Sequence, residues 1–288
     1  MTGEDSYRPP LELSHPLANA KLEQNFLLKQ SLAQKLQGWL EGPQHQNLTR
    51  CGSEKMYRTC ESCGKWTELT YRCSIRWCPV CNWRITADRR KILTFWNLRI
   101  SQPKHLVLTR RNETGVLTQS LFKHTMASFA RLRRCDVMRE CKGGCVSMET
   151  THEGRGWHVH LHALLDARFV DVKAVAIDWG RLMGQDFAIV RIDDLRTKPY
   201  AQEVLKYVVK SDDMVRWRPE RILEFIRACR GVRFFRVFGS LYRYREELKS
   251  FLASGKEPHR CECGSCQHRY DNERSDVLRQ HRKEHPSR

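Results

Sequence analysis

The segment from Trp157 to Asp166 constrains the fold of this chain most, because three histidines alternate in it with apolar residues. A β-strand turns successive side chains to opposite faces. His158, His160 and His162 therefore line one face, while the residues between them enter a core. Imidazoles held side by side on a rigid strand are typical of a metal site. A histidine-rich strand that only faces solvent is the alternative, and the apolar residues of the run argue against it.

A second strand is expected at residues 144–152, followed by a turn signal. If the turn centres between Gly154 and Arg155, Glu149 lies opposite His160, and the two side chains share a face. Two or three imidazoles and one carboxylate would then coordinate one ion. A mixed nitrogen and oxygen set with open positions suits Mg²⁺ or Mn²⁺ better than a closed structural zinc site. A register slip of one residue would turn Glu149 away.

A third candidate element is a helix over residues 198–210, with a proline near its first turn. Tyr200, Glu203, Tyr207 and Lys210 are spaced so that they share one stripe of that helix. A glutamate one turn before a tyrosine, with a lysine one turn after it, indicates a chemical role. An ordinary amphipathic helix whose aromatic residues pack in the core remains the alternative.

Three motifs, in this order, resemble those of the HUH endonucleases, and most closely the single-tyrosine replication initiator (Rep) proteins of rolling-circle plasmids. The motifs are His105-Leu106-Val107-Leu108-Thr109, His160-Leu161-His162 and Glu203-x-x-Lys206-Tyr207-x-x-Lys210. The resemblance spans roughly residues 60–245 and includes a cysteine-rich stretch before the first motif. It implies an α+β fold with a mostly antiparallel sheet and helices on one face, which leaves the other face open for DNA.

The resemblance also implies an enzyme that nicks and rejoins DNA. Tyr207 would attack a phosphodiester in single-stranded or extruded origin DNA, form a 5′-phosphotyrosine and later rejoin or release the strand. Glu203 matches a residue associated with activating water at termination. The positions that match metal ligands are His160 and His162, with Glu149 as the acidic ligand and His158 as an additional candidate. A host helicase and a DNA polymerase are the expected partners.

Elementary chemistry agrees with these roles. A free tyrosine has a pKa of about 10 and is a poor nucleophile at neutral pH. A divalent ion on the scissile phosphate would act as a Lewis acid and orient the phosphorus. Lys210 could stabilise the phenolate or the charge that grows on phosphate, or it could contact the DNA backbone instead; both roles remain open.

The net charge of the chain is +18, and its isoelectric point is near 9.6. An excess of lysine and arginine of this size favours a polyanionic partner such as nucleic acid. No long apolar run, signal peptide or lipidation motif is evident, so we expect a cytoplasmic protein without a membrane partner. The basic, aromatic-rich segment 233–245 could bind DNA through Arg233, Arg236 and Arg243. It could equally be an edge strand with solvated arginines.

Thirteen cysteines occur, several of them in C-x₂-C pairs. Cys60–Cys63 and Cys78–Cys81 are separated by fourteen residues, and two such pairs are typical of a four-thiolate structural zinc site. Cys51 and Cys73 are left over. Either could replace one of the four or belong to a second site.

A further cluster near the C-terminus consists of Cys263, Cys266, His281 and His285. It predicts a zinc finger of the Cys₂His₂ type, although the interval between its halves is two residues longer than usual. Cys261 and His268 are alternative ligands. A basic tail without fixed structure is the other interpretation.

These patterns predict four regions: an N-terminal arm with a helix (1–50), a cysteine-rich zinc module with a linker helix (51–98), a nicking domain (99–250) and a C-terminal Cys/His basic tail (251–288). Within them, helices are expected at 21–41, 117–134, 171–183 and 218–230, and further strands at 104–110 and 187–192. A single-tyrosine HUH transposase would share the chemistry and is an alternative function. A zinc-finger nucleic-acid-binding regulator without enzymatic activity is a less favoured one.

Overall fold

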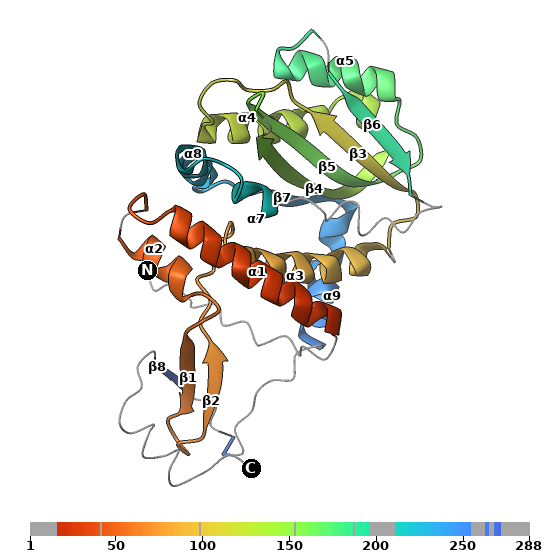
Figure 1. Cartoon of the computed structure of the whole chain (residues 1–288). Coiled ribbons are helices and arrows are strands. Elements are labelled where there is room, and N and C mark those ends of the chain that lie inside the picture. Colours follow the sequence, from red (N-terminus) through yellow and green to blue (C-terminus); the bar gives the residue numbers. More distant parts are fainter. Residues whose placement is uncertain are drawn as a thin grey trace.

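The computed structural model describes residues 16–40, 42–97, 99–152, 154–186, 188–195, 211–254, 263–264 and 268–271. Its strands form a five-stranded sheet in the order β6-β3-β5-β4-β7 and a three-stranded sheet in the order β2-β1-β8. The two sheets lie at opposite ends of the molecule, and helices of the N-terminal third lie between them (Figure 1).

The five-stranded sheet is antiparallel at every pairing. Its strands are β3 (Pro103–Thr109), β4 (Cys141–His152), β5 (Trp157–Ala167), β6 (Val190–Asp194) and β7 (Phe235–Gly239). Together with the helices around it, this sheet confirms the predicted α+β fold class.

The β4–β5 hairpin has the register that the turn signal predicts. His152 pairs with Trp157 and Glu149 with His160, so no slip has occurred. The turn depends on glycine at Gly156, where φ is +99° and an added Cβ would lie 2.4 Å from the carbonyl oxygen of Glu113. The two strands therefore present the same alternation of polar and apolar faces.

The apolar face of the sheet packs against three helices: α4 (Gln119–Leu132), α5 (Val172–Met183) and α8 (Pro219–Cys229). All three were expected from the sequence to within about two residues at each end, which is the usual ambiguity of helix boundaries. Capping residues explain two of the starts. The Thr118 hydroxyl accepts a hydrogen bond from the Leu121 amide, and the Asp171 carboxylate accepts from two amides of the first turn of α5.

The opposite face, which carries the histidines, is partly covered by α3 (Pro79–Asn97). Leu93 and Trp96 of this helix share a buried cluster with Leu164, and the Trp96 ring stacks on Phe235 with 6.2 Å between centroids. The face expected to be open is therefore closed at the end distant from the hairpin turn. His158 and His160, nearer the turn, remain partly exposed.

The first two helices are α1 (Pro16–Lys35) and α2 (Pro43–Arg50). The helix expected at 21–41 ends earlier, because a turn containing Gly38 at φ +77° intervenes. Leu32 of α1 and Leu36 just after it are fully buried. The remaining short elements are η1 (Asp136–Met138), α7 (Ser211–Met214), η2 (Ser240–Tyr244) and α9 (Arg245–Ser254).

The small sheet joins distant parts of the chain. It consists of β1 (Lys55–Cys60), β2 (Trp66–Thr70) and β8 (His268–Asp271), with β1 in the centre. Within the described ranges, the region expected as a separate tail thus adds a strand to the cysteine-rich module. No helix in those ranges is both long and apolar enough to cross a membrane.

Candidate metal-binding face and cysteine clusters

The histidine-bearing face of the β4–β5 hairpin holds two close pairs of donor atoms. Nε2 of His162 lies 3.0 Å from Oε2 of Glu149, and Nε2 of His160 lies 3.0 Å from Nδ1 of His158. Glu149 and His162 are 5% and 8% exposed, whereas the other two histidines are half-buried. The site therefore has a sealed end and an accessible end.

The spacing of these donors is that of ordinary hydrogen bonds and is also compatible with neighbouring ligands of a divalent ion. Neighbouring ligands about 2.1 Å from an octahedral ion are themselves about 3.0 Å apart. Both pairs have that separation. The four expected ligands form two pairs rather than one group: among the residues that the structure describes, the groups with three or more donors within 4.8 Å of one another consist of cysteines.

Strand β3 supports the same histidines from the other side. Nε2 of His105 lies 3.2 Å from Nδ1 of His162, and Nδ1 of His105 lies 3.9 Å from the Asp193 carboxylate of β6. The Thr109 hydroxyl lies 3.2 Å from Nδ1 of His160. These supporting roles were not expected from the sequence. Alternation within 104–110 already places His105 and Thr109 on one face, but their contact with β5 depends on the order of strands in the sheet.

The expected nucleophile helix cannot be compared with these positions. Tyr207, Glu203 and Lys210 lie outside the described residues, within the segment that joins β6 to α7. Their roles stay predictions.

Four cysteines form the first sulfur cluster: Cys51, Cys73, Cys78 and Cys81. The Sγ atom of Cys81 lies 3.5 Å from that of Cys51 and 3.6 Å from that of Cys73, and the Cys78 and Cys51 sulfurs are 3.7 Å apart. In a tetrahedral zinc site with Zn–S bonds of about 2.3 Å, sulfur atoms are about 3.8 Å apart. The cluster has the donor set and the dimensions of such a site.

Three separate segments supply these four sulfurs. Cys51 caps the end of α2, Cys73 follows β2, and Cys78 and Cys81 flank the first turn of α3. A backbone hydrogen bond from the Gly52 amide to the Tyr71 carbonyl (2.9 Å) fastens the first two segments together.

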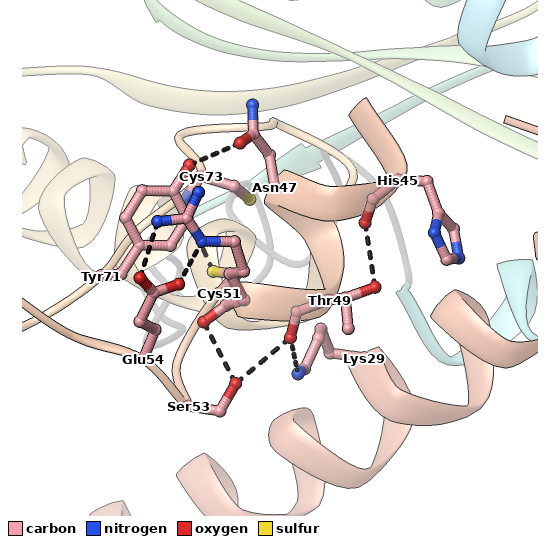
Figure 2. Close-up of polar contacts among 10 residues, drawn as sticks. Lys29, His45, Asn47, Thr49, Cys51, Ser53, Glu54, Tyr71 and Cys73 are labelled. Atoms are coloured by element: carbon pink, nitrogen blue, oxygen red, sulfur yellow. Dashed lines mark hydrogen bonds and ion pairs between the residues drawn. The ribbon is translucent and has the colours of Figure 1, made fainter. Parts of the chain in front are cut away.

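A lysine lies buried beside this cluster. Figure 2 shows Lys29 of α1 reaching Thr49, where its Nζ donates to the backbone carbonyl at 2.9 Å. Burial lowers the pKa of Lys29, and the thiolates of Cys51 and Cys78 act in the opposite direction. The positive charge of Lys29 thus offsets part of the negative charge of the thiolates in this cluster.

A second cluster consists of Cys60, Cys63 and Cys263, whose sulfurs lie within 4.8 Å of one another. The expected four-thiolate set of Cys60, Cys63, Cys78 and Cys81 is therefore divided between two clusters. The reason is the length of β1. The first cluster lies near the start of this strand and the second at its end, and six strand residues span about 20 Å. Of the expected C-terminal finger, Cys266, His281 and His285 lie outside the described residues.

The basic segment at 233–245 is partly an edge strand. β7 pairs with β4 at one margin of the large sheet, and Phe234 and Phe238 are buried rather than available to stack on bases. The three arginines expected to contact DNA, Arg233, Arg236 and Arg243, are all exposed. The segment can therefore offer charges to phosphates, with Tyr242 as an exposed aromatic.

Two curated proteins similar to this chain are both named Protein rep. The one from Streptococcus pneumoniae serotype 2 (strain D39 / NCTC 7466) is 28% identical over 169 residues, which are 49% of this chain and 52% of that protein. The one from Lentilactobacillus hilgardii is 27% identical over 188 residues, 54% of this chain and 59% of that protein. The chain thus matches between one half and three fifths of each relative. No protein-family model matches it, and no solved structure matches it significantly.

Proposed function

We propose that this protein is a replication initiator that nicks single-stranded or extruded origin DNA by tyrosine attack and later rejoins or releases the strand. The observation that carries the proposal is the pairing of His162 with Glu149 and of His160 with His158 on one face of a central hairpin. The similarity to two proteins named Protein rep supports the initiator role, and the net charge of +18 supports a nucleic-acid partner.

A chain of contacts orients His162. Nε2 of His105 lies 3.2 Å from Nδ1 of His162, and Nε2 of His162 lies 3.0 Å from the Glu149 carboxylate. The Asp193 oxygen lies 3.9 Å from Nδ1 of His105, which is too far for a hydrogen bond. Such contacts commonly orient a histidine that ligates a metal, so the arrangement supports a ligand role for His162.

In this proposal His160, His162 and Glu149 would hold Mg²⁺ or Mn²⁺, with His158 as an additional ligand, and the two donor pairs would have to close on one ion when it binds. The ion when bound supplies Lewis-acid stabilisation of the scissile phosphate. The phenol oxygen of Tyr207 forms a bond to phosphorus, and the bond from phosphorus to the 3′-oxygen breaks. The phenol gives up its proton as this bond forms, and the 3′-oxygen takes up one proton and leaves as a hydroxyl group. A host polymerase extends this 3′-OH after a helicase separates the strands. Glu203 activates water for release, and Lys210 stabilises the developing negative charge.

We propose zinc as the ion of the first cysteine cluster. Four thiolates at these separations form a closed site, which suits a structural rather than a catalytic ion. Its role would be to hold α2, β2 and α3 together.

The proposal is tested by incubating the full chain with single-stranded oligonucleotides that tile both strands of the replicon carrying its gene. With Mn²⁺ or Mg²⁺ present, we expect a protein–DNA adduct that survives a denaturing gel, and peptide mapping should locate the nucleotide on Tyr207. A chelator should prevent adduct formation. Absence of an adduct with every divalent ion would refute the enzymatic proposal, and an adduct on another tyrosine, such as the exposed Tyr242, would refute the assignment of the nucleophile.

Replacing His105 by alanine should weaken the metal site without removing a ligand. A residue that orients a metal-bound histidine typically contributes 10- to 100-fold to metal affinity. We therefore expect the Mn²⁺ concentration needed for half-maximal adduct formation to rise by about that factor, with most of the activity restored at saturating Mn²⁺. Activity that stays low at all Mn²⁺ concentrations, with an unchanged half-maximal concentration, would show that His105 does not act through the metal.

A further inference from the structure

The second sulfur cluster joins two parts of the chain that are 203 residues apart. Sγ of Cys60, the last residue of β1, lies 3.5 Å from Sγ of Cys263. Cys63 completes a group whose three sulfurs lie within 4.8 Å of one another. We propose that these three thiolates bind a second structural zinc ion, which fastens the C-terminal segment onto the β1–β2 ribbon.

The turn after β1 is shaped to present two sulfurs on one side. The Cys60 amide donates to the Lys65 carbonyl at 2.8 Å, and the Gly64 amide donates back to the Cys60 carbonyl at 2.9 Å. Gly64 adopts φ +70°, a conformation that favours glycine. A C-x₂-C turn closed in this way directs both thiolates toward one tetrahedral ion.

Strand pairing brings the third sulfur to the same place. β8 pairs antiparallel with β1, from Tyr57 opposite Asp271 to Cys60 opposite His268. Cys263 precedes this strand by only a few residues, so the C-terminal segment reaches the cluster as it enters the sheet. Pairing and sulfur contact are independent observations that place this segment at the end of β1.

The small sheet has little apolar burial of its own to hold a third strand. Among its described side chains, Tyr57, Cys60 and Leu69 are the buried apolar ones. Three strands need a hydrophobic face or another cross-link for stability, and small modules commonly use a metal for this purpose. A zinc ion at the end of β1 would supply the missing cross-link.

A disulfide explains the cluster less well. A disulfide joins two sulfurs at about 2.05 Å. Here three sulfurs are grouped, and the Cys60 and Cys263 sulfurs are 3.5 Å apart, near the separation of about 3.8 Å expected on zinc. The ion would then replace the separate C-terminal finger expected from sequence.

The test is zinc content per chain, measured by native mass spectrometry on the full-length protein. The wild type should hold two zinc ions. Cys63→Ser and Cys263→Ser should each hold one, and the double variant should also hold one, because both residues serve the same ion. Retention of the first zinc in each variant shows that the rest of the fold persists. Cys135→Ser, whose thiol belongs to neither described cluster, is the matched control and should hold two.

His281→Ala separates this proposal from a finger formed by the tail alone. The proposal expects two zinc ions in this variant; loss of one would overturn it and favour the finger. A double variant with fewer ions than either single variant would mean that Cys63 and Cys263 serve different ions, which also overturns it. An intact mass lower by two hydrogens, with Cys60 and Cys263 linked after denaturation without reductant, would assign a disulfide instead.

Discussion

Replacing His162 by alanine is expected to slow formation of the covalent DNA adduct by roughly 10³-fold, a loss of about 4 kcal/mol of transition-state stabilisation. Its Nε2 lies beside Glu149, and its Nδ1 is held by His105. Removing the imidazole deletes one ligand and leaves the Glu149 carboxylate buried without that partner. The rate is measured by quenching the reaction on denaturing gels at saturating Mn²⁺.

His124→Ala provides the matched control for this experiment. His124 is exposed on α4, which packs on the opposite, apolar face of the sheet, so its loss should leave the rate within about twofold. Binding of single-stranded DNA at fixed salt should change little in either variant, because phosphate contacts by lysine and arginine dominate affinity. A His162→Ala protein that binds DNA normally and still nicks at the wild-type rate would exclude the histidine face from the chemistry.

Replacing Cys81 by serine is expected to remove one zinc ion and to lower the melting temperature by more than about 10 °C. Cys81 is 5% exposed, and its sulfur contacts both Cys51 and Cys73. Without the ion, the start of α3 loses its attachment to α2 and β2. A structural zinc contributes directly to folding free energy, and a loss of more than about 5 kcal/mol corresponds to this shift in a chain of this size. Calorimetry, with zinc content measured in parallel, checks both effects.

Cys229→Ser is the control for that measurement. Burial raises the pKa of the Cys229 thiol well above its ordinary value, so this cysteine stays protonated and is a poor metal ligand at neutral pH. We expect its variant to keep the wild-type zinc content and to melt within a few degrees of the wild type. If Cys81→Ser retained full zinc content, the four-thiolate assignment would be wrong, whatever the change in melting temperature.

Most elements of the large sheet and the helices on its apolar face could be predicted because their signals are local. Alternation with a period of two specified β5, and the turn residues specified its register with Glu149 opposite His160. The helix α4 likewise follows the expected range of 117–134, because an amphipathic repeat is a local pattern. Such signals depend only on neighbours along the chain.

The contacts of β3 with the histidines of β5 could not be predicted in the same way. His105 meets His162 because β3 lies beside β5, although 57 residues separate the two histidines in sequence. The cysteines show the same limit. C-x₂-C spacing identifies pairs that bind metal, but it does not say which pairs share an ion, and here a strand of six residues separates the two expected partners.

The amino-acid sequence alone determined most of the elements, the polar face of the hairpin and the C-x₂-C pairs, because each follows from backbone periodicity and short-range geometry. Only the tertiary structure decided which distant side chains meet: Asp193 with His105, Cys51 with Cys81, and Cys60 with Cys263. These contacts depend on the order of strands in each sheet and on where distant segments of the chain pack together. Both are set by packing of the whole molecule rather than by any local pattern.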